Sequence, residues 1–261
     1  MTEGYSLRQM AGIRSRRTLR RIINHWLTIS PLTPEFGTAR YVLFDCTFLA
    51  GRTAAVGVVM AAAGGTYRIV VGAYGFKENS IPNVRAHFQT YRRQGLNPTS
   101  ITVDGNPRVI TVLRELWPAC LIQRCLVHIQ RQGLMWCRQQ PKTVAGKTLR
   151  KLFLRVTKIH TDKERDDFLS EVEAWERRFG HSIASATEAG WVMSDLKRAR
   201  AMLRHALPDM FHYLHDQNIP HTTNALEGYF GRMKRHYVNH RGLAVRKRAA
   251  YFAWYFVLHQ E

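Results

Sequence analysis

Two aspartates lie where the sequence predicts apolar strands, a setting in which acidic side chains are uncommon. Asp45 is inside the apolar run Tyr41–Phe48, and Asp104 directly follows the short run Ser100–Val103. Acidic residues are disfavoured in strand interiors, and a buried carboxylate is costly unless it is paired or bound to a metal ion. Asp45 alone also fits a structural or edge-strand role, and Asp104 fits a turn or a helix cap. On two strands of one sheet, however, the two residues indicate neighbouring carboxylates, for which a divalent cation is the natural compensation.

Glu227 is the best candidate for a third acid that would complete a two-metal site. It is the only acidic residue between Asp216 and Glu261, and it lies in a strongly basic segment that is predicted to be helical. The alternative is that Glu227 pairs with a neighbouring arginine. Asn224 lies three residues earlier on the same helical face, where it could orient Glu227.

The elements that would position these acids follow from the hydrophobic pattern. Short connections between the first three strands, with a hairpin signal at Gly64-Gly65, predict an antiparallel meander. The order βββαβαβ then predicts a mixed α/β sheet. The predicted strands are 41–48, 53–62, 66–76, 100–103 and 119–127, and the predicted helices are 80–94 and 107–116. Residues 128–215 are predicted to be mainly helical, and 222–261 to form two helices separated near 239–242.

The first 30 residues form a basic segment with helical spacing. Leu7, Met10 and Ala11 predict a first helix, Gly12 interrupts it, and Ser15 can cap a second. The second helix has a basic face, which consists of Arg14, Arg16, Arg17, Arg20 and Arg21. We expect residues 1–30 to be a helix-turn-helix-like DNA-binding segment. The alternative is an amphipathic helix pair docked on the main domain. A linker is predicted at 30–37.

The charge balance points to a polyanionic partner. The 261 residues include 39 Lys and Arg against 19 Asp and Glu, a formal net charge of +20. Nucleic acid is the leading candidate and an anionic membrane surface the lesser one. Hydrophobic residues make up 45% of the chain, which excludes global disorder. No apolar run approaches the roughly 18 residues of a membrane span, and the start of the chain lacks a secretory pattern. We therefore expect no membrane partner and a location in the bacterial cytoplasm, associated with the nucleoid.

Three short motifs follow one another in the sequence: Val103-Asp104-Gly105, Cys125-Leu126-Val127-His128 and Asn224-Ala225-Leu226-Glu227. In this order they resemble the second-aspartate motif, the Cys-x-x-His motif that follows it and the Asn-x-x-Glu helix of the RNase H-like DDE transposases, particularly the bacterial insertion-sequence and Mutator-like groups. The resemblance covers roughly residues 38–260. It implies an RNase H-like catalytic domain over 38–261, with a helical insertion at about 129–215.

The resemblance also implies roles for the acids. Asp45, Asp104 and Glu227 would hold two Mg²⁺ ions about 3.5–4 Å apart, with Mn²⁺ able to replace them. One ion would activate water, or later a DNA 3′-OH, and the other would stabilise the leaving 3′ oxygen. Asn224, Cys125 and His128 would lie beside the metal site. The residues expected to contact DNA at the element ends and the target are Arg16, Arg17, Arg20, Arg21, Arg232, Lys234 and Arg235. A homodimer or higher oligomer on DNA is expected.

The cysteines and tryptophans allow other interpretations. Cys120, Cys125, His128 and Cys137 do not have the paired C-x-x-C spacing typical of zinc sites, so zinc is not expected. Four cysteines in a chain of this length do not indicate a disulfide framework. We expect core positions for the tryptophans, although one in the insertion could stack on an unpaired base. These are Trp117, Trp136, Trp175, Trp191 and Trp254.

Two further functions remain open at the level of sequence. One is a catalytically inactive, transposase-derived DNA-binding protein, and the other is a different RNase H-like two-metal nuclease. The presence of all three acids favours an active enzyme over the first alternative. The long helical insertion and the Cys-x-x-His motif favour a transposase over the second.

Overall fold

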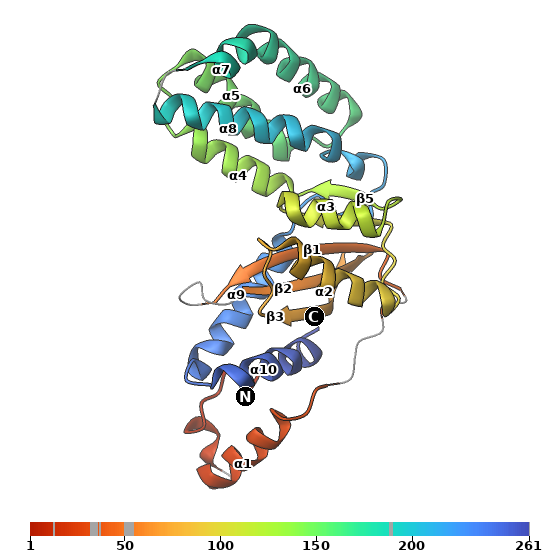
Figure 1. The fold of residues 1–261 in the computed structure, drawn as a ribbon, viewed down its shortest axis with the longest axis vertical. Helices are drawn as coiled ribbons and strands as arrows, with labels where there is room; N and C mark the ends of the chain where they lie inside the picture. Colours follow the sequence, from red (N-terminus) through yellow and green to blue (C-terminus); the bar gives the residue numbers. More distant parts are fainter. Residues whose placement is uncertain (13, 32–35, 37, 50–54, 188–189, 261) are drawn as a thin grey trace. The chain divides into compact units, whose positions relative to one another are not determined.

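The protein is an α/β fold with one five-stranded mixed sheet flanked by helices (Figure 1). The computed structural model describes residues 1–12, 14–31, 36, 38–49, 55–187 and 190–260. The chain divides into two compact units. Unit 1 consists of Met1–Ile101, Asn106–Cys120 and Thr223–Glu261, and unit 2 consists of Thr102–Gly105 and Leu121–Thr222.

The sheet has the strand order β3-β2-β1-β4-β5, which places β1 in its centre. The first three strands form the predicted antiparallel meander, in which Tyr41 of β1 pairs with Ala62 of β2. Gly64 and Gly65 make the hairpin turn with φ of +54° and +82°, a conformation that favours glycine. The strands are β1 (Tyr41–Phe48), β2 (Ala55–Ala63), β3 (Thr66–Tyr74), β4 (Ser100–Val103) and β5 (Leu121–Arg124).

The two faces of the sheet in unit 1 are covered by different helix pairs (Figure 1). One face packs on α2 (Ile81–Arg93) and α3 (Pro107–Leu116), where the ring of Phe44 lies 4.9 Å from that of Phe88. The opposite face carries α9 (Asn224–Tyr237) and α10 (Val245–Leu258), whose buried side chains share a core cluster with Leu43 of β1. Because side chains alternate along a strand, Asp45 belongs with Leu43 to the α9–α10 face.

Helix α9 has one buried apolar face and one open polar face. Its apolar stripe is buried against the sheet and α10, with Phe230 5% exposed. The opposite stripe is open, because Asn224 and Lys234 are exposed and Glu227 is half-buried. The buried stripe consists of Leu226, Tyr229, Phe230, Met233 and Tyr237. Packing therefore fixes which side of α9 carries Glu227.

Unit 2 is mainly helical, as predicted for residues 128–215. Its helices are α4 (Leu126–Cys137), α5 (Val144–Arg155), α6 (Asp162–Trp175), α7 (His181–Ser185) and α8 (Trp191–Ala206), with a π-helical turn at Glu176–Gly180. Helices α4 and α5 approach closely at Gly133, where an added Cβ would lie 2.3 Å from the ring of Phe153.

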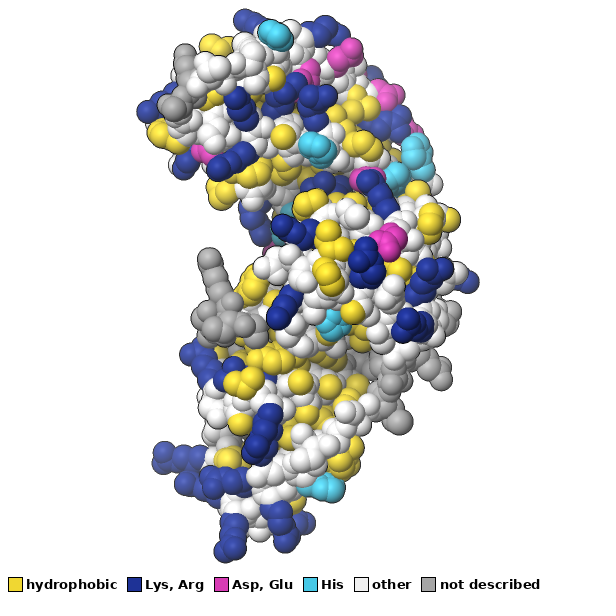
Figure 2. Space-filling model, viewed as in Figure 1, with side chains coloured by type: hydrophobic (Ala, Val, Ile, Leu, Met, Phe, Trp, Pro, Cys, Tyr) yellow, Lys and Arg dark blue, Asp and Glu magenta, His cyan; other side chains and the backbone are white. Residues whose placement is uncertain are grey.

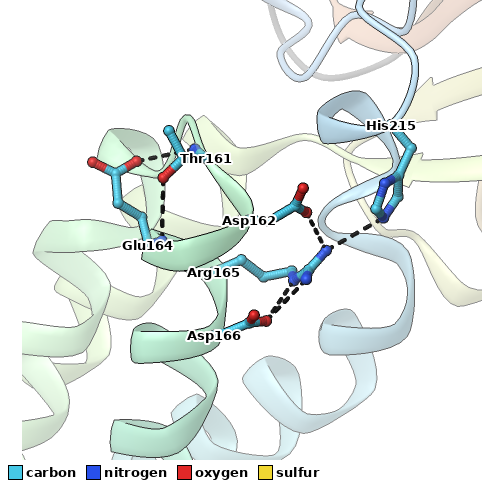
Figure 3. Close-up of polar contacts among 6 residues, drawn as sticks. All are labelled: Thr161, Asp162, Glu164, Arg165, Asp166 and His215. Carbon is cyan, nitrogen blue, oxygen red and sulfur yellow. Dashed lines mark hydrogen bonds and ion pairs between the residues drawn. The ribbon is translucent and has the colours of Figure 1, made fainter.

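The start of α6 shows how unit 2 uses its acidic residues (Figure 3). Thr161 and Glu164 form a capping box, in which the Glu164 carboxylate accepts from the Thr161 amide at 3.0 Å. Arg165 donates to Asp162 at 2.5 Å and to Asp166 at 2.9 Å, and its guanidinium lies 3.3 Å from the ring nitrogen of His215. Three acids in the first two turns of this helix, Asp162, Glu164 and Asp166, thus have hydrogen-bonding partners within the unit.

The N-terminal segment is less helical than the sequence predicts. Ser15 caps α1 (Arg16–Trp26) as expected, and its hydroxyl accepts from the Thr18 amide at 3.2 Å. The first helix, however, is only a four-residue 3-10 turn at Gln9–Gly12. Gly12 ends this turn before a stable helix can form, since short isolated helices are marginal.

Other expectations have mixed outcomes. Strands β1 and β4 and helix α3 have the predicted bounds, whereas the fifth strand ends at Arg124 and not at Val127.

Trp117 and Trp175 are buried as predicted, but Trp191 is 52% exposed, and the Arg138 guanidinium lies 4.8 Å from the centre of its ring. The predicted linker 30–37 falls largely outside the described residues. Among the described helices, none has the length and apolar character needed to cross a membrane.

The packing of α9 gives a first prediction. Phe230→Ala should lower the free energy of unfolding by about 3–5 kcal/mol, because a buried ring is replaced by a cavity. Lys234→Ala on the exposed face of the same helix should change it by no more than about 0.5 kcal/mol. Urea unfolding followed by circular dichroism measures both. Equal urea midpoints for Phe230→Ala and the parent protein would show that the apolar face of α9 does not pack in the core.

Candidate active site

Asp45 occupies a buried position on the central strand of unit 1. It is 8% exposed, which rules out the edge-strand alternative. One carboxylate oxygen accepts from the Cys46 amide at 2.7 Å, and the other accepts from the Thr223 hydroxyl at 3.5 Å. Thr223 immediately precedes α9, so the carboxylate lies at the N-terminal end of that helix. The positive end of the helix dipole stabilises a negative charge at this place.

Glu227 belongs to the same corner of unit 1. It is in the first turn of α9, and its amide donates to the carbonyl of Thr223 at 3.1 Å. The residue that contacts Asp45 is therefore one helical turn from Glu227. Asn224 begins α9 and is exposed. Unit 1 thus brings two of the three predicted acids to the junction of β1 and α9.

Asp104 follows β4 and lies in unit 2. The cap of α3 is Asn106, whose side chain accepts from the Arg108 amide at 3.0 Å, so Asp104 does not serve as the helix cap. The carbonyl of Asp104 accepts from the Arg124 guanidinium at 3.4 Å. Gly105 has φ of +115°, and an added Cβ there would lie 1.8 Å from the Arg124 Nη2. Asp104 is therefore held beside a guanidinium that packs directly on the backbone.

Arg124 is a functional candidate that the sequence did not single out. It ends β5 and is only 6% exposed, although arginine is rarely buried without a partner. Buried cations need anionic or hydrogen-bonding groups around them. The sequence feature that could have identified Arg124 is the polar pair Gln123-Arg124 at the end of an otherwise apolar strand.

The Cys-x-x-His motif begins a helix at the same corner of unit 2. Cys125 is fully buried at the start of α4, and its amide donates to the carbonyl of Val103 at 2.8 Å. Val103 directly precedes Asp104. His128 lies in the first turn of α4. The motif is therefore on a helix, where the sequence placed it at the end of a strand.

The segment before α9 is attached to this corner as well. The Thr102 hydroxyl donates to the carbonyl of Pro220 at 2.5 Å, and the Leu126 amide donates to that of His221 at 3.0 Å. Burial lowers the pKa of His221, which favours its neutral form. Sequence reasoning assigned no specific role to these residues, because both bonds use backbone carbonyls that no side-chain pattern reveals.

The acids have the donor chemistry for a hard divalent cation, since carboxylate oxygens are what Mg²⁺ prefers. The described part of the chain contains no group of three or more His, Cys, Asp or Glu side chains arranged to hold a metal ion. Two of the predicted ligands belong to unit 1 and the third belongs to unit 2. Burial raises the pKa of the Cys120 and Cys137 thiols to about 12, which disfavours the thiolate form that binds zinc.

The basic residues predicted to contact DNA are exposed. Four lie on α1 and three on α9, and all have solvent-accessible side chains. These are Arg16, Arg17, Arg20, Arg21, Arg232, Lys234 and Arg235. Unit 1 has 22 Lys and Arg against 7 Asp and Glu, which leaves +15, whereas unit 2 has 17 against 12, which leaves +5. The charge excess is thus concentrated in the unit that carries Asp45 and Glu227.

The Asp104 corner gives a second prediction. Gly105→Ala should lower the free energy of unfolding by about 1–3 kcal/mol more than Gly95→Ala, because its Cβ would displace Arg124. Gly95 is a matched control, since it also has a positive φ, +100°, but has open space around it. Backbone strain is therefore similar in the two variants. Urea unfolding of both variants measures the difference, and equal losses would show that Arg124 does not pack on this glycine.

Comparison with protein-family models and with curated proteins finds no match to the chain.

Proposed function

We propose that the chain is a DDE-type DNA transposase with an RNase H-like catalytic domain, which cleaves DNA at element ends and transfers the strands into target DNA. The observation that carries the proposal is the position of Asp45. It is a buried carboxylate on a central strand, and it is hydrogen-bonded at the start of the helix whose first turn carries Glu227. A catalytic pair needs this combination of burial and fixed geometry.

Asp104 is proposed as the third acid because of the motif that contains it. Val103-Asp104-Gly105 resembles the second-aspartate motif of the DDE transposases. Asp104 directly follows β4, which is the neighbour of β1 in the sheet.

In the proposed reaction, water or a DNA 3′-OH attacks the phosphorus atom in line with the leaving 3′ oxygen. The new P–O bond forms as the P–O3′ bond breaks, and no covalent enzyme–DNA intermediate is needed. Two bound Mg²⁺ ions, which Mn²⁺ can replace, would supply activation of the attacking oxygen and stabilisation of the leaving one. Asp45, Asp104 and Glu227 would hold these ions, and zinc is not required.

The surrounding residues would orient the acids and the DNA. Asn224 is exposed at the start of α9 and would orient Glu227 or contact the substrate. Cys125 and His128 would support the Asp104 corner through the start of α4. The cations of α1 and α9 would bind phosphates. We further propose that a homodimer or higher oligomer assembles on DNA, in the bacterial nucleoid.

A strand-transfer assay tests the proposal. Labelled fragments that carry the DNA flanking the coding sequence are incubated with the protein, Mg²⁺ and a supercoiled target plasmid. We expect nicks at defined positions and covalent joining to the plasmid, both abolished by EDTA. Binding without cleavage in Mg²⁺ or Mn²⁺ would indicate a catalytically inactive DNA-binding protein. Cleavage without joining would indicate a different two-metal nuclease.

The acids provide the third prediction. Asp45→Ala, Asp104→Ala and Glu227→Ala should each abolish cleavage and joining, because loss of one carboxylate removes a metal ligand, while DNA affinity remains within a few-fold of the parent. Asp167→Ala, an exposed acid of α6, should retain full activity as a control. The readouts are the strand-transfer assay and a DNA-binding titration. A variant with near-normal cleavage would remove that residue from the proposed triad.

The charge provides the fourth prediction. With about 8–10 phosphates neutralised, the logarithm of the DNA-binding constant should fall against the logarithm of salt concentration with a slope near −7 to −9. Fluorescence anisotropy with a labelled duplex, measured at several KCl concentrations, gives this slope. A flat salt response would contradict an electrostatic role for the basic surface of unit 1.

A further inference from the structure

Unit 1 contains a cleft that the proposed chemistry does not use. Its volume is about 630 Å³, within the range of small-molecule sites. It is lined by Met1 and residues 6–10 near the N-terminus, by one side of α1, and by residues 239–247, which comprise the turn before α10 and the start of that helix. The cleft therefore joins the two ends of the chain within one unit.

The lining is strongly basic. It includes Arg8, Arg16, Arg20 and Lys247, and none of the described residues that line it is acidic. The three arginines are exposed, and the Lys247 ammonium is positioned by a hydrogen bond of 2.7 Å to the Asn24 side chain across the cleft. Burial lowers the pKa of His240, so the positive charge near pH 7 comes from the Arg and Lys side chains. In Figure 2, dark-blue side chains gather at the α1 end of unit 1.

The start of α10 adds a second feature that favours anions. Leu243 and Ala244 line the cleft, and α10 begins at Val245 without a side-chain cap and without an acidic residue in its first turn. The first amides of a helix lack intrahelical partners, and the helix dipole is positive at this end. An uncapped N-terminus beside four cations is the chemistry that binds phosphate groups.

We propose that this cleft is a clamp for a short segment of the phosphate backbone of one strand of duplex DNA, in which α1 and the start of α10 bind phosphates from opposite walls. Arg16 and Arg20 would bind from the α1 wall, and Lys247 with the amides of α10 from the other. The proposal rests on the proposed function for the identity of the polyanion. The proposed site differs from the expected helix-turn-helix-like segment at residues 1–30, because the turn before α10 and the start of α10 form one of its two walls.

The geometry separates two pairs of arginines on one helix. Arg16 and Arg20 are four residues apart and line the cleft, whereas Arg17 and Arg21 have the same spacing and do not line it. All four are exposed. If DNA were attracted only by the net charge, removal of either pair would weaken DNA binding equally. If the cleft is a clamp, removal of Arg16 and Arg20 should weaken it more.

The test compares two double variants that remove the same charge from the same helix. Affinity for a labelled 20-base-pair duplex of random sequence is measured by anisotropy without Mg²⁺. Arg16→Ala/Arg20→Ala should weaken binding at least 10-fold more than Arg17→Ala/Arg21→Ala, and should reduce the steepness of the salt slope by about 2. Equal losses in the two double variants would overturn the proposal. Thermal melting checks that both remain folded.

Lys247 provides a second readout. Lys247→Ala should weaken binding, and Lys247→Arg, which keeps the charge, should restore it. Duplex DNA should also protect Lys247 from acetylation by a soluble acetylating reagent, while Lys163, exposed in unit 2, remains reactive. Unchanged acetylation of Lys247 in the presence of saturating duplex would overturn the proposal.

The outcomes distinguish this proposal from the proposed enzyme. If the protein binds duplex through the cleft but does not cleave DNA with Mg²⁺, the clamp stands and the transposase proposal fails. If cleavage occurs and the two arginine pairs behave alike, the clamp alone fails. Tighter binding of a double-stranded RNA competitor than of duplex DNA would overturn DNA as the occupant.

Discussion

The burial of the Asp45 carboxylate is the constraint that organises unit 1. An ion removed from water on a central strand costs several kcal/mol unless other groups replace the lost hydration. Here the Cys46 amide, the Thr223 hydroxyl and the start of α9 provide that replacement. The N-terminal end of α9 must therefore lie at β1, and the buried apolar stripe of α9 keeps it there. Since α9 follows the whole of unit 2 in the sequence, the chain must return to the sheet to complete this corner.

A buried cation sets the geometry of the other corner. Arg124 packs on the backbone at Gly105, where a positive φ and the absence of a Cβ allow the guanidinium to approach. The hydrogen bond from the Cys125 amide to the Val103 carbonyl links the start of α4 to the end of β4. A substituted side chain at position 105 would displace the arginine and disturb the residue next to Asp104. The short motif Asp104-Gly105 therefore combines an acid with the one residue type that permits this packing.

Much of the fold could be predicted because local patterns determine it. The alternation of Tyr41–Phe48, the Gly64-Gly65 turn and the apolar stripe of α9 each specify an element, and the structure has them. Predictions were wrong where tertiary context overrides the pattern. The apolar run at 119–127 continues past Arg124 in the sequence, but Leu126 and Val127 are in α4. Trp191 is hydrophobic but exposed, because Arg138 and Lys142 lie over its ring and make a polar setting acceptable. The buried Arg124 and the basic cleft were missed because each depends on segments far apart in the sequence.

The division of charge between the units follows from how each uses its acids. In unit 2, several carboxylates are paired with cations of the same unit, as in the contacts of Arg165 with Asp162 and Asp166 and of Arg200 with Glu176. Such pairs leave little net field at a distance, because the fields of two opposite charges a few ångströms apart largely cancel. In unit 1 the described acids are few, and two of them, Asp45 and Glu227, belong to the candidate site. Unit 1 has 22 Lys and Arg against 7 Asp and Glu, so its cations far outnumber the acids that could neutralise them. A surface of that kind is destabilised by self-repulsion unless a polyanion neutralises it, so the same residues that weaken the isolated unit would favour the proposed complex with DNA.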